Sequence, residues 1–257
     1  MIPWSLLATA EIPGGGGELR LVKRGAEFSI MAGRVELMNS RRGGSEGALA
    51  TISCQRMSAL QMPRILIGGL GMGFTLRAAL GELGPDARIT VAELVPEVVA
   101  WARAPMAELF GSSLMDPRVS ICEADVGALI GSGRSTYDAI LLDVDNGPQG
   151  LTRSANDRLY DAKGLSAAKT ALRPGGILAI WSCGPNANFA KRLRSSGFDV
   201  QEVAVRANGA GGGARHVIWV ASLPSPTGIR ANQTGSGETN EARERGLGRV
   251  RPTPAER

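Results

Sequence analysis

The sequence predicts an α/β protein with a Rossmann-like, doubly wound and mostly parallel seven-stranded sheet that ends in an antiparallel hairpin, together with a small N-terminal β unit. Apolar runs alternate with amphipathic stretches from Pro63 to Ser222, which is typical of a parallel sheet covered by helices. Two apolar segments near the end of this region, 198–205 and 214–221, are separated only by a glycine-rich connection. Because so short a connection cannot contain a crossover helix, we expect these segments to pair antiparallel.

The chain divides into three regions of different texture. Residues 1–44 contain short polar and apolar alternations split by glycines, and they predict an antiparallel unit of two or three strands. Residues 45–222 form the predicted Rossmann-like domain. Residues 223–257 are rich in Pro, Gly, Thr, Asn and Arg and contain no aromatic residue, so we expect a disordered tail.

The elements of the Rossmann-like domain follow one another in a regular order. The expected strands before the hairpin are 64–69, 88–94, 118–125, 137–143 and 177–182. The expected helices are 45–57, 75–83, 96–110, 125–130, 156–172 and 188–197. Ser45 is the expected cap of the first helix, and Pro105 should break or kink the third. The nearly continuous apolar character of 137–143 favours a strand at the centre of the sheet, covered on both faces.

The composition excludes several classes of protein. The chain has 257 residues, of which 43% are hydrophobic and 21% charged, as in an ordinary soluble globular protein. No stretch approaches the roughly 20 apolar residues that span a bilayer, and no basic residues precede the short N-terminal apolar run, so we expect neither a membrane anchor nor a secretory signal. The net charge is +5, but the basic residues are scattered among acids, and aromatic residues make up 4% of the chain. We therefore expect no nucleic-acid partner.

Cysteine and histidine usage points to an intracellular protein without a metal centre. Cys54, Cys122 and Cys183 are far apart and odd in number, which predicts a reducing cytoplasm and no metal site. The single histidine, His216, lies in an expected strand, where a packed or surface role is the expectation. No nucleophile-elbow pattern accompanies it, so a Ser-His-Asp hydrolase is disfavoured.

A glycine-rich turn follows the first strand of the Rossmann-like domain and precedes a helix. Its candidate cofactor-binding residues are Gly68, Gly69, Gly71 and Gly73. Small residues at this place let the backbone approach a ligand at the carboxyl end of the strand. The turn has the spacing G-x-G-x-G, and Phe74 stands where a dinucleotide fingerprint has its third glycine. A tight turn without a ligand is the alternative.

Acidic residues stand at the carboxyl ends of three further strands. Glu93 ends the second strand, 20 residues after Gly73, where a carboxylate can accept hydrogen bonds from both hydroxyls of a ribose. Asp125 ends the third strand, where it could accept from an adenine amino group or cap the next helix. Asp143 ends the fourth, and Asp145 follows closely. Two carboxylates so close together repel one another, and such a pair is usually kept because it binds a cation or moves a proton.

At these residues the sequence resembles the spermidine synthase family, also called polyamine aminopropyltransferases, within the class I S-adenosylmethionine-dependent methyltransferase-like superfamily. The resemblance covers about residues 19–222. Five segments carry it in the same order: ILIGGLGMGFTLR, VAELVPEVV, DPRVSICEAD, YDAILLDVDNGP and LRPGGILAIWS.

The resemblance implies a transferase whose co-substrate is S-adenosylmethionine or its decarboxylated form, with no metal. It implies that Glu93 holds the ribose and Asp125 the adenine amino group. It also implies that Asp143 and Asp145 are catalytic and line the pocket for a small amine acceptor such as putrescine. Asp145 is the better match to the family's base, and which acid takes which role stays open. A homodimer is also implied, with the N-terminal strands covering the acceptor pocket, although these strands could equally protect a sheet edge.

Three departures from the family pattern concern substrate choice. The family's glycine loop contains an aspartate that helps to hold the terminal amine of the decarboxylated donor, and Gly71 stands nearest to that place. The Tyr-His-Glu motif is missing, because the corresponding helix contains only Glu46 as an acid, and the Pro-Thr-Tyr segment is replaced by RANGAGGGA. Aminopropyl transfer and methyl transfer are therefore both open. Met38, Asn39, Ser40 and Glu46 are the residues that could face the acceptor pocket.

Two other functional classes compete with a transferase. A non-catalytic nucleoside-binding protein would explain the altered acceptor side. A dehydrogenase is supported by the position of Glu93, but Phe74 and the antiparallel ending of the sheet argue against it.

Overall fold

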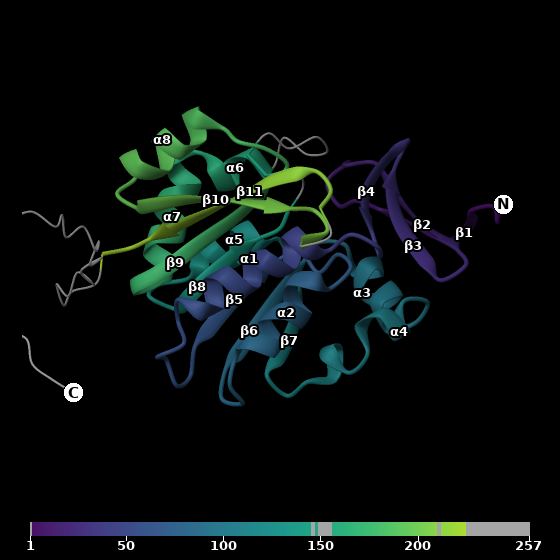
Figure 1. Ribbon diagram of the computed structural model, residues 1–257, viewed down its shortest axis with the longest axis horizontal. Coiled ribbons are helices and arrows are strands. Elements are labelled where there is room, and N and C mark those ends of the chain that lie inside the picture. Colours follow the sequence, from purple (N-terminus) through teal and green to yellow (C-terminus); the bar gives the residue numbers. More distant parts are fainter. Residues whose placement is uncertain (1, 145–146, 149–155, 210–211, 225–257) are drawn as a thin grey trace, which may run out of the picture. The chain divides into compact units, whose positions relative to one another are not determined.

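The computed structural model describes residues 2–144, 147–148, 156–209 and 212–224. It contains two sheets (Figure 1). One has four strands in the order β1-β2-β3-β4, and the other has seven strands in the order β10-β11-β9-β8-β5-β6-β7. The predicted fold class is confirmed. Asp145 and residues 225–257 of the predicted tail lie outside the described residues.

The N-terminal sheet is antiparallel throughout. Its strands are β1 (Ser5–Glu11), β2 (Glu18–Arg24), β3 (Glu27–Ala32) and β4 (Val35–Asn39). The expectation of two or three strands was wrong, because the short apolar run at the start of the chain forms β1 and pairs with β2. Such a run carries no clear period of its own, and only the neighbouring strand gives its backbone groups partners.

The seven-stranded sheet is parallel from β9 to β7 and closes on an antiparallel hairpin. Its strands are β5 (Arg64–Gly68), β6 (Arg88–Glu93), β7 (Val119–Glu123), β8 (Tyr137–Leu142), β9 (Leu172–Ser182), β10 (Asp199–Arg206) and β11 (Arg215–Ser222). β9 begins earlier than expected, at Leu172 instead of Ile177. The register shows why: Tyr137 pairs with Leu172 but Ala139 pairs with Ile177, so the intervening residues form a bulge within the strand.

The helices agree with the predicted order, with local differences. They are α1 (Gly44–Gln55), α2 (Phe74–Glu82), α3 (Pro96–Arg103), α4 (Ala107–Phe110), the 3-10 turn η1 (Ser113–Met115), α5 (Val126–Ser132), α6 (Asp157–Tyr160), α7 (Ala162–Ala171) and α8 (Ala187–Ser195). The predicted break at Pro105 separates α3 from α4. The expected helix cap at Ser45 was wrong: Gly43 is the N-cap residue of α1, and the Ser45 hydroxyl hydrogen-bonds to the Glu46 side chain instead.

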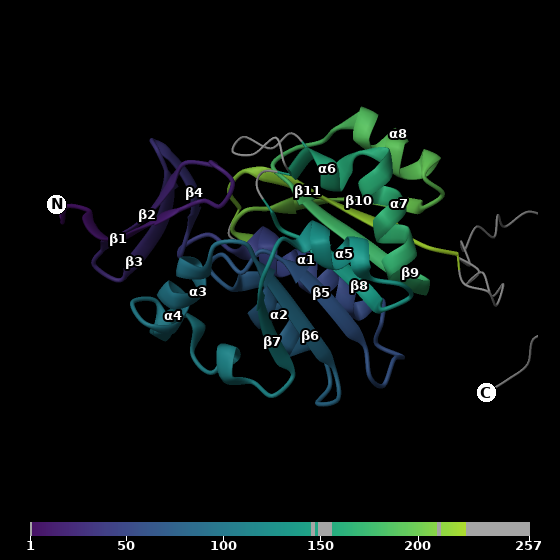
Figure 2. The same cartoon turned by 180° about the vertical axis from the view of Figure 1, so that it is seen from behind.

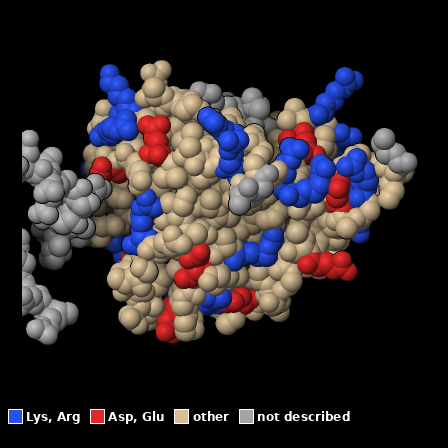
Figure 3. Space-filling model, in the orientation of Figure 1, with Lys and Arg blue, Asp and Glu red and all other residues tan. Residues whose placement is uncertain are grey.

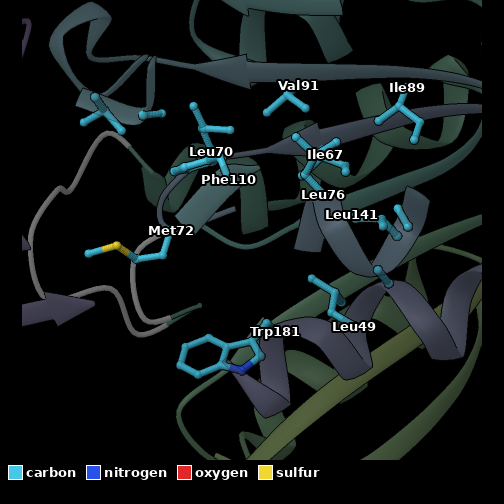
Figure 4. Packing of buried hydrophobic residues seen from close by; sticks show 14 of the residues in the cluster. Leu49, Ile67, Leu70, Met72, Leu76, Ile89, Val91, Phe110, Leu141 and Trp181 are labelled. Carbon is cyan, nitrogen blue, oxygen red and sulfur yellow. The ribbon is translucent and has the colours of Figure 1, made fainter. Parts of the chain in front are cut away.

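Helices cover both faces of the seven-stranded sheet (Figures 1 and 2). Successive residues of each strand point to opposite faces, and the buried residues form one hydrophobic cluster on each face. Ile67 and Leu141 belong to the cluster with α1, α2 and α3, whereas Leu66 and Leu142 belong to the cluster with α5, α7 and α8. The first of these clusters, shown in Figure 4, also includes buried residues of β2 and β3. The N-terminal sheet and the helices α1, α2 and α3 therefore share one hydrophobic core.

Two features of the structure concern nucleic-acid and membrane partners: the distribution of surface charge and the character of the helices. On the face shown in Figure 3, Lys and Arg side chains are interspersed with Asp and Glu side chains. Within the described ranges, no helix is long and apolar enough to cross a bilayer.

Candidate functional site

The glycine-rich turn joins β5 to α2 at the carboxyl end of the sheet. Gly69, Gly71 and Gly73 have positive φ values of 85°, 49° and 73°, a region of backbone conformation that glycine adopts at little cost. A Cβ atom at Gly69 would lie 2.8 Å from the carbonyl oxygen of Asp143. Glycine at this position therefore lets the end of β8 approach the loop, which continues directly from Gly68.

Glu93, the last residue of β6, holds this loop in place. Its Oε2 accepts a hydrogen bond from the backbone N–H of Leu70 and its Oε1 one from Val95, both at 2.9 Å. The side chain is buried, with 8% exposure, so it is not a solvated charge at a strand end. Burial raises the pKa of the Glu93 carboxyl, against the lowering effect of these backbone hydrogen bonds. A carboxylate that already accepts from the loop backbone still has lone pairs for ligand hydroxyls.

Asp125 follows β7 and caps the next helix. Its Oδ1 accepts a hydrogen bond of 2.7 Å from the backbone N–H of Gly127, as an N-cap residue of α5. The capping role that the sequence left open is therefore present. Asp125 also lines the same cavity as Glu93, so capping fixes the carboxyl at the edge of this cavity.

Two cavities lie side by side at the glycine loop and share part of their walls. The Glu93 chamber, with a volume of about 150 Å³, is bounded by Glu93 and Asp125 among others. The Glu46 chamber, with a volume of about 120 Å³, is bounded by Glu46, Phe74 and Trp181 among others. Five residues line both chambers: Leu37, Met38, Gly69, Gly71 and Asp143. The two chambers are thus the two sides of one site.

The N-terminal sheet supplies part of this wall, through Leu37 and Met38 of β4. Of the four residues expected near an acceptor pocket, Met38 and Glu46 line the Glu46 chamber. Asn39 and Ser40 instead organise the turn after β4: Asn39 Oδ1 accepts from the backbone of Arg41, and Ser40 Oγ accepts from the backbone of Phe28. Leu37 and Trp181 are lining residues that sequence reasoning missed, because an apolar side chain carries no signal for a site.

Glu46 and Asp143 form a pair of carboxyl groups facing the Glu46 chamber. The Thr75 hydroxyl donates a hydrogen bond of 2.9 Å to Asp143 Oδ2. Burial, with the negative charge of Glu46 as the second cause, raises the pKa of Asp143 to about 7, although the Thr75 hydrogen bond lowers it. Burial also raises the pKa of Glu46, against the hydrogen bond from Ser45. Near neutral pH this pair can therefore take up or release a proton.

The described residues contain Asp143 of the two acids that the sequence proposed as catalytic. Asp145 lies outside them, so the choice between the two acids is not decided by geometry. The partner of Asp143 is Glu46, one of the residues expected to face the acceptor pocket, and it comes from α1 and not from a strand end.

Comparison with known proteins shows which proteins the chain resembles. No family model matches the sequence. The chain is 30% identical over 125 residues to a polyamine aminopropyltransferase of Korarchaeum cryptofilum, a match that covers 49% of this chain and 37% of that protein. It is also 30% identical over 151 residues to polyamine aminopropyltransferase 2 of Pseudomonas aeruginosa, over 54% of this chain and 41% of that protein. The chain is thus similar to part of the polyamine aminopropyltransferases.

Solved structures share the fold of this chain. A spermidine synthase from Thermotoga maritima superimposes with a TM-score of 0.66 at 14% identity, over 84% of this chain and 72% of that one. A spermidine synthase in complex with the transition-state analogue AdoDATO gives a TM-score of 0.66 at 15% identity, with the same coverage. The matched part of the chain spans less than half the length of these curated relatives.

One departure from the aminopropyltransferase pattern has a structural explanation. Gly71 stands nearest the place of the loop aspartate that the resemblance implies. A Cβ atom at Gly71 would lie 3.0 Å from the Met38 sulfur, and the φ of 49° is strained for any other residue. Met38 of β4 therefore covers the place that an acidic side chain would need, and the wall between the two chambers is apolar at this point.

Proposed function

We propose that this chain binds a sulfonium nucleoside of the S-adenosylmethionine type in the Glu93 chamber and transfers one of its alkyl groups to a small amine in the Glu46 chamber. One observation carries the proposal: the Asp143 carboxyl lines both chambers. A proton-accepting group at this boundary stands where a nucleophile from one chamber would meet an electrophilic carbon from the other.

The residues of the Glu93 chamber fit a nucleoside. The glycines at 69, 71 and 73 leave the loop backbone open to close approach. Glu93 is a buried carboxyl at the end of β6, the place from which an acid accepts hydrogen bonds from ribose hydroxyls. Asp125 at the end of β7 would accept from the adenine amino group. These roles are part of the proposal.

The reaction asks little covalent chemistry of the protein. An ammonium acceptor first loses a proton, its nitrogen then attacks the carbon bonded to sulfur, and the electrons of the broken C–S bond remain on the thioether that leaves. A sulfonium is already a good leaving group, so the protein mainly aligns the reactants and removes the proton. Asp143, with its pKa raised to about 7, is the described group best suited to accept that proton near neutral pH. Negative charge on Asp143 or Glu46 would also favour a cationic acceptor.

Two nucleosides are candidates for the alkyl donor. The names of the sequence relatives support aminopropyl transfer from the decarboxylated donor to a diamine such as putrescine. Methyl transfer from the intact donor is the second candidate, and the Gly71 and Met38 arrangement favours it. Gly71 has no acidic side chain, which would repel the carboxylate of intact S-adenosylmethionine.

Calorimetric titration with the two donors separates these candidates. A preference for the decarboxylated donor, followed by turnover with putrescine, would establish aminopropyl transfer. A preference for intact S-adenosylmethionine would establish the methyl-transfer candidate. Binding of neither donor would overturn the proposal. The Asp143→Asn variant completes the test, because it should keep most of the donor affinity and lose most of the turnover.

The assembly and location of the protein are also predictions. We propose a homodimer, as the resemblance implies, located in the cytoplasm, as the cysteine usage predicts. Light scattering of the purified chain gives the mass that decides between a monomer and a dimer.

A further inference from the structure

His216 lies beside the Glu46 chamber and not on an isolated surface. It belongs to β11, on the same face as Ile218, which packs in the cluster covered by α1. Its half-buried ring lies edge-to-face against Trp181, with ring centroids 4.7 Å apart and an interplanar angle of 73°. Since Trp181 lines the Glu46 chamber, the imidazole stands directly behind the chamber wall.

A continuous hydrogen-bonded chain leads from this imidazole into the chamber. His216 Nδ1 lies 2.9 Å from Ser45 Oγ. The Ser45 hydroxyl in turn donates to Glu46 Oε2 at 2.6 Å. The start of α1 is fixed against the hairpin, because the Gly44 N–H donates to the Ala207 carbonyl oxygen at 2.9 Å. Ser45 itself is fully buried, so it connects a half-exposed group with one that faces the cavity.

The two hydrogen bonds allow two arrangements of the protons. A hydroxyl has one proton, and when Ser45 gives it to an ionised Glu46, the serine oxygen can only accept from His216, so Nδ1 carries a hydrogen. When Glu46 is protonated, the direction can reverse: Glu46 donates to Ser45, and Ser45 donates to a bare Nδ1. Passing from the second arrangement to the first moves one proton from Glu46 to Ser45 and one from Ser45 to His216. The net result is one proton carried from the carboxyl to the imidazole.

Amine alkylation releases a proton that such a path can carry away. An ammonium acceptor and a sulfonium donor give a secondary ammonium, a neutral thioether and one free proton in each turnover. Glu46 and Asp143 receive this proton inside the chamber, and one of them must be emptied before the next turnover. Burial lowers the pKa of His216, which favours the neutral ring. When Glu46 becomes protonated, the ring first exchanges its Nδ1 hydrogen for one on Nε2 through water. The bare Nδ1 then takes the proton from Ser45, and Nε2 releases one to solvent, which restores the form with hydrogen on Nδ1.

We infer that Ser45 and His216 form a proton exit path that empties the Glu46–Asp143 pair to the surface, with both acting through Glu46 and not on the substrate. This inference rests on the proposed amine alkylation. The ionisable groups on the path besides His216 are Glu46 of α1 and Asp143 after β8.

Nuclear magnetic resonance tests the path without turnover. The chain has one histidine, so a protein labelled with ¹⁵N in the imidazole gives signals from His216 alone. At neutral pH we expect hydrogen on Nδ1 in the wild type. Glu46→Gln should lower the titration midpoint of His216 by about half a pH unit or more, that is about threefold in proton affinity. Ser45→Ala should change the balance between the Nδ1–H and Nε2–H forms.

The matched control is Ser53→Ala, a second buried serine of α1 whose hydroxyl donates to the Leu49 carbonyl oxygen. It removes the same group from the same helix away from the path, and the His216 signals should not change. If Ser45→Ala and Glu46→Gln also leave the His216 signals unchanged, the path does not exist. Spectra of each variant report whether it is folded.

Kinetics test the role in turnover. His216→Ala should lower kcat about tenfold with little change in KM for the donor, and added imidazole buffer should restore most of the rate, since a diffusible base can replace the missing one. Ser45→Thr, which keeps the hydroxyl, should retain more activity than Ser45→Ala. A His216→Ala variant with unchanged kcat, or with a loss that no buffer restores, would overturn the inference. If the wild type turns over no donor and amine pair, the proposed function fails, and the resonance experiment still decides whether the path exists.

Discussion

The Asp143→Asn substitution should stabilise the folded protein increasingly as the pH rises. Burial and the charge of Glu46 raise the pKa of Asp143 from 3.8 to about 7. A pKa difference of one corresponds to about 1.4 kcal/mol, so the ionised carboxyl costs the folded state about 4 kcal/mol. Asparagine removes this cost and can still accept the hydrogen bond from Thr75.

The pH dependence has a definite sign. Below about pH 4 the carboxyl is protonated in both states and costs nothing. Between about pH 4 and about pH 7 the unfolded chain loses the proton while the folded chain keeps it, so the free energy of unfolding falls. Above about pH 7 the full cost is present. The advantage of the variant over the wild type should therefore grow by about 3 kcal/mol between about pH 5 and about pH 8.

Urea unfolding of both proteins at the two pH values measures this difference. Asp86→Asn is the matched control, because Asp86 is exposed in the turn before β6, and the same substitution should change stability by less than about 0.5 kcal/mol. An advantage of Asp143→Asn that is equal at both pH values would refute the argument. If the advantage grows with pH as expected, the carboxyl is kept at a cost in stability, which indicates selection for its chemistry.

Three further predictions concern the site and the core. Gly71→Ala should lower the free energy of unfolding by about 1–3 kcal/mol, because φ is 49° and the Met38 sulfur is close; unfolding no easier than in the wild type would contradict this strain. Glu93→Gln should weaken binding of the sulfonium nucleoside at least tenfold in calorimetry, since Glu93 shapes the loop; undiminished affinity would remove Glu93 from the site. Leu141→Ala, at a side chain with 0% exposure, should cost about 2–5 kcal/mol, whereas Leu60→Ala, at 46% exposure, should cost much less, and equal losses would argue against the described core.

Much of the fold could be predicted from the sequence because its signals are local. The run 137–143 is nearly continuously apolar, and its residues Tyr137–Leu142 form β8 at the centre of the sheet. The short glycine-rich connection before β11 required an antiparallel hairpin, and one is present. Pro105 cannot continue a helix, and α3 ends before it. In each case a few adjacent residues carry the physical constraint.

The failures share the opposite property. β1 is a strand because β2 offers it backbone partners, and the bulge at the start of β9 exists because β8 sets its register. Serine is a residue type preferred at helix caps, but the Ser45 hydroxyl lies between Glu46 and His216, which gives it better partners than the helix end. Competition between distant partners cannot be read from a window of neighbouring residues.

The same division holds at the candidate site. The sequence by itself determined the glycine turn, the acids that end β6, β7 and β8, and the side of the sheet where they meet, since the ends of parallel strands must lie at one edge. Only the tertiary structure brought Met38 over Gly71, Glu46 to Asp143 and His216 to Ser45, because these pairs come from elements far apart in the chain. Their proximity follows from how α1, the N-terminal sheet and the final hairpin pack, and no periodicity or motif encodes that packing.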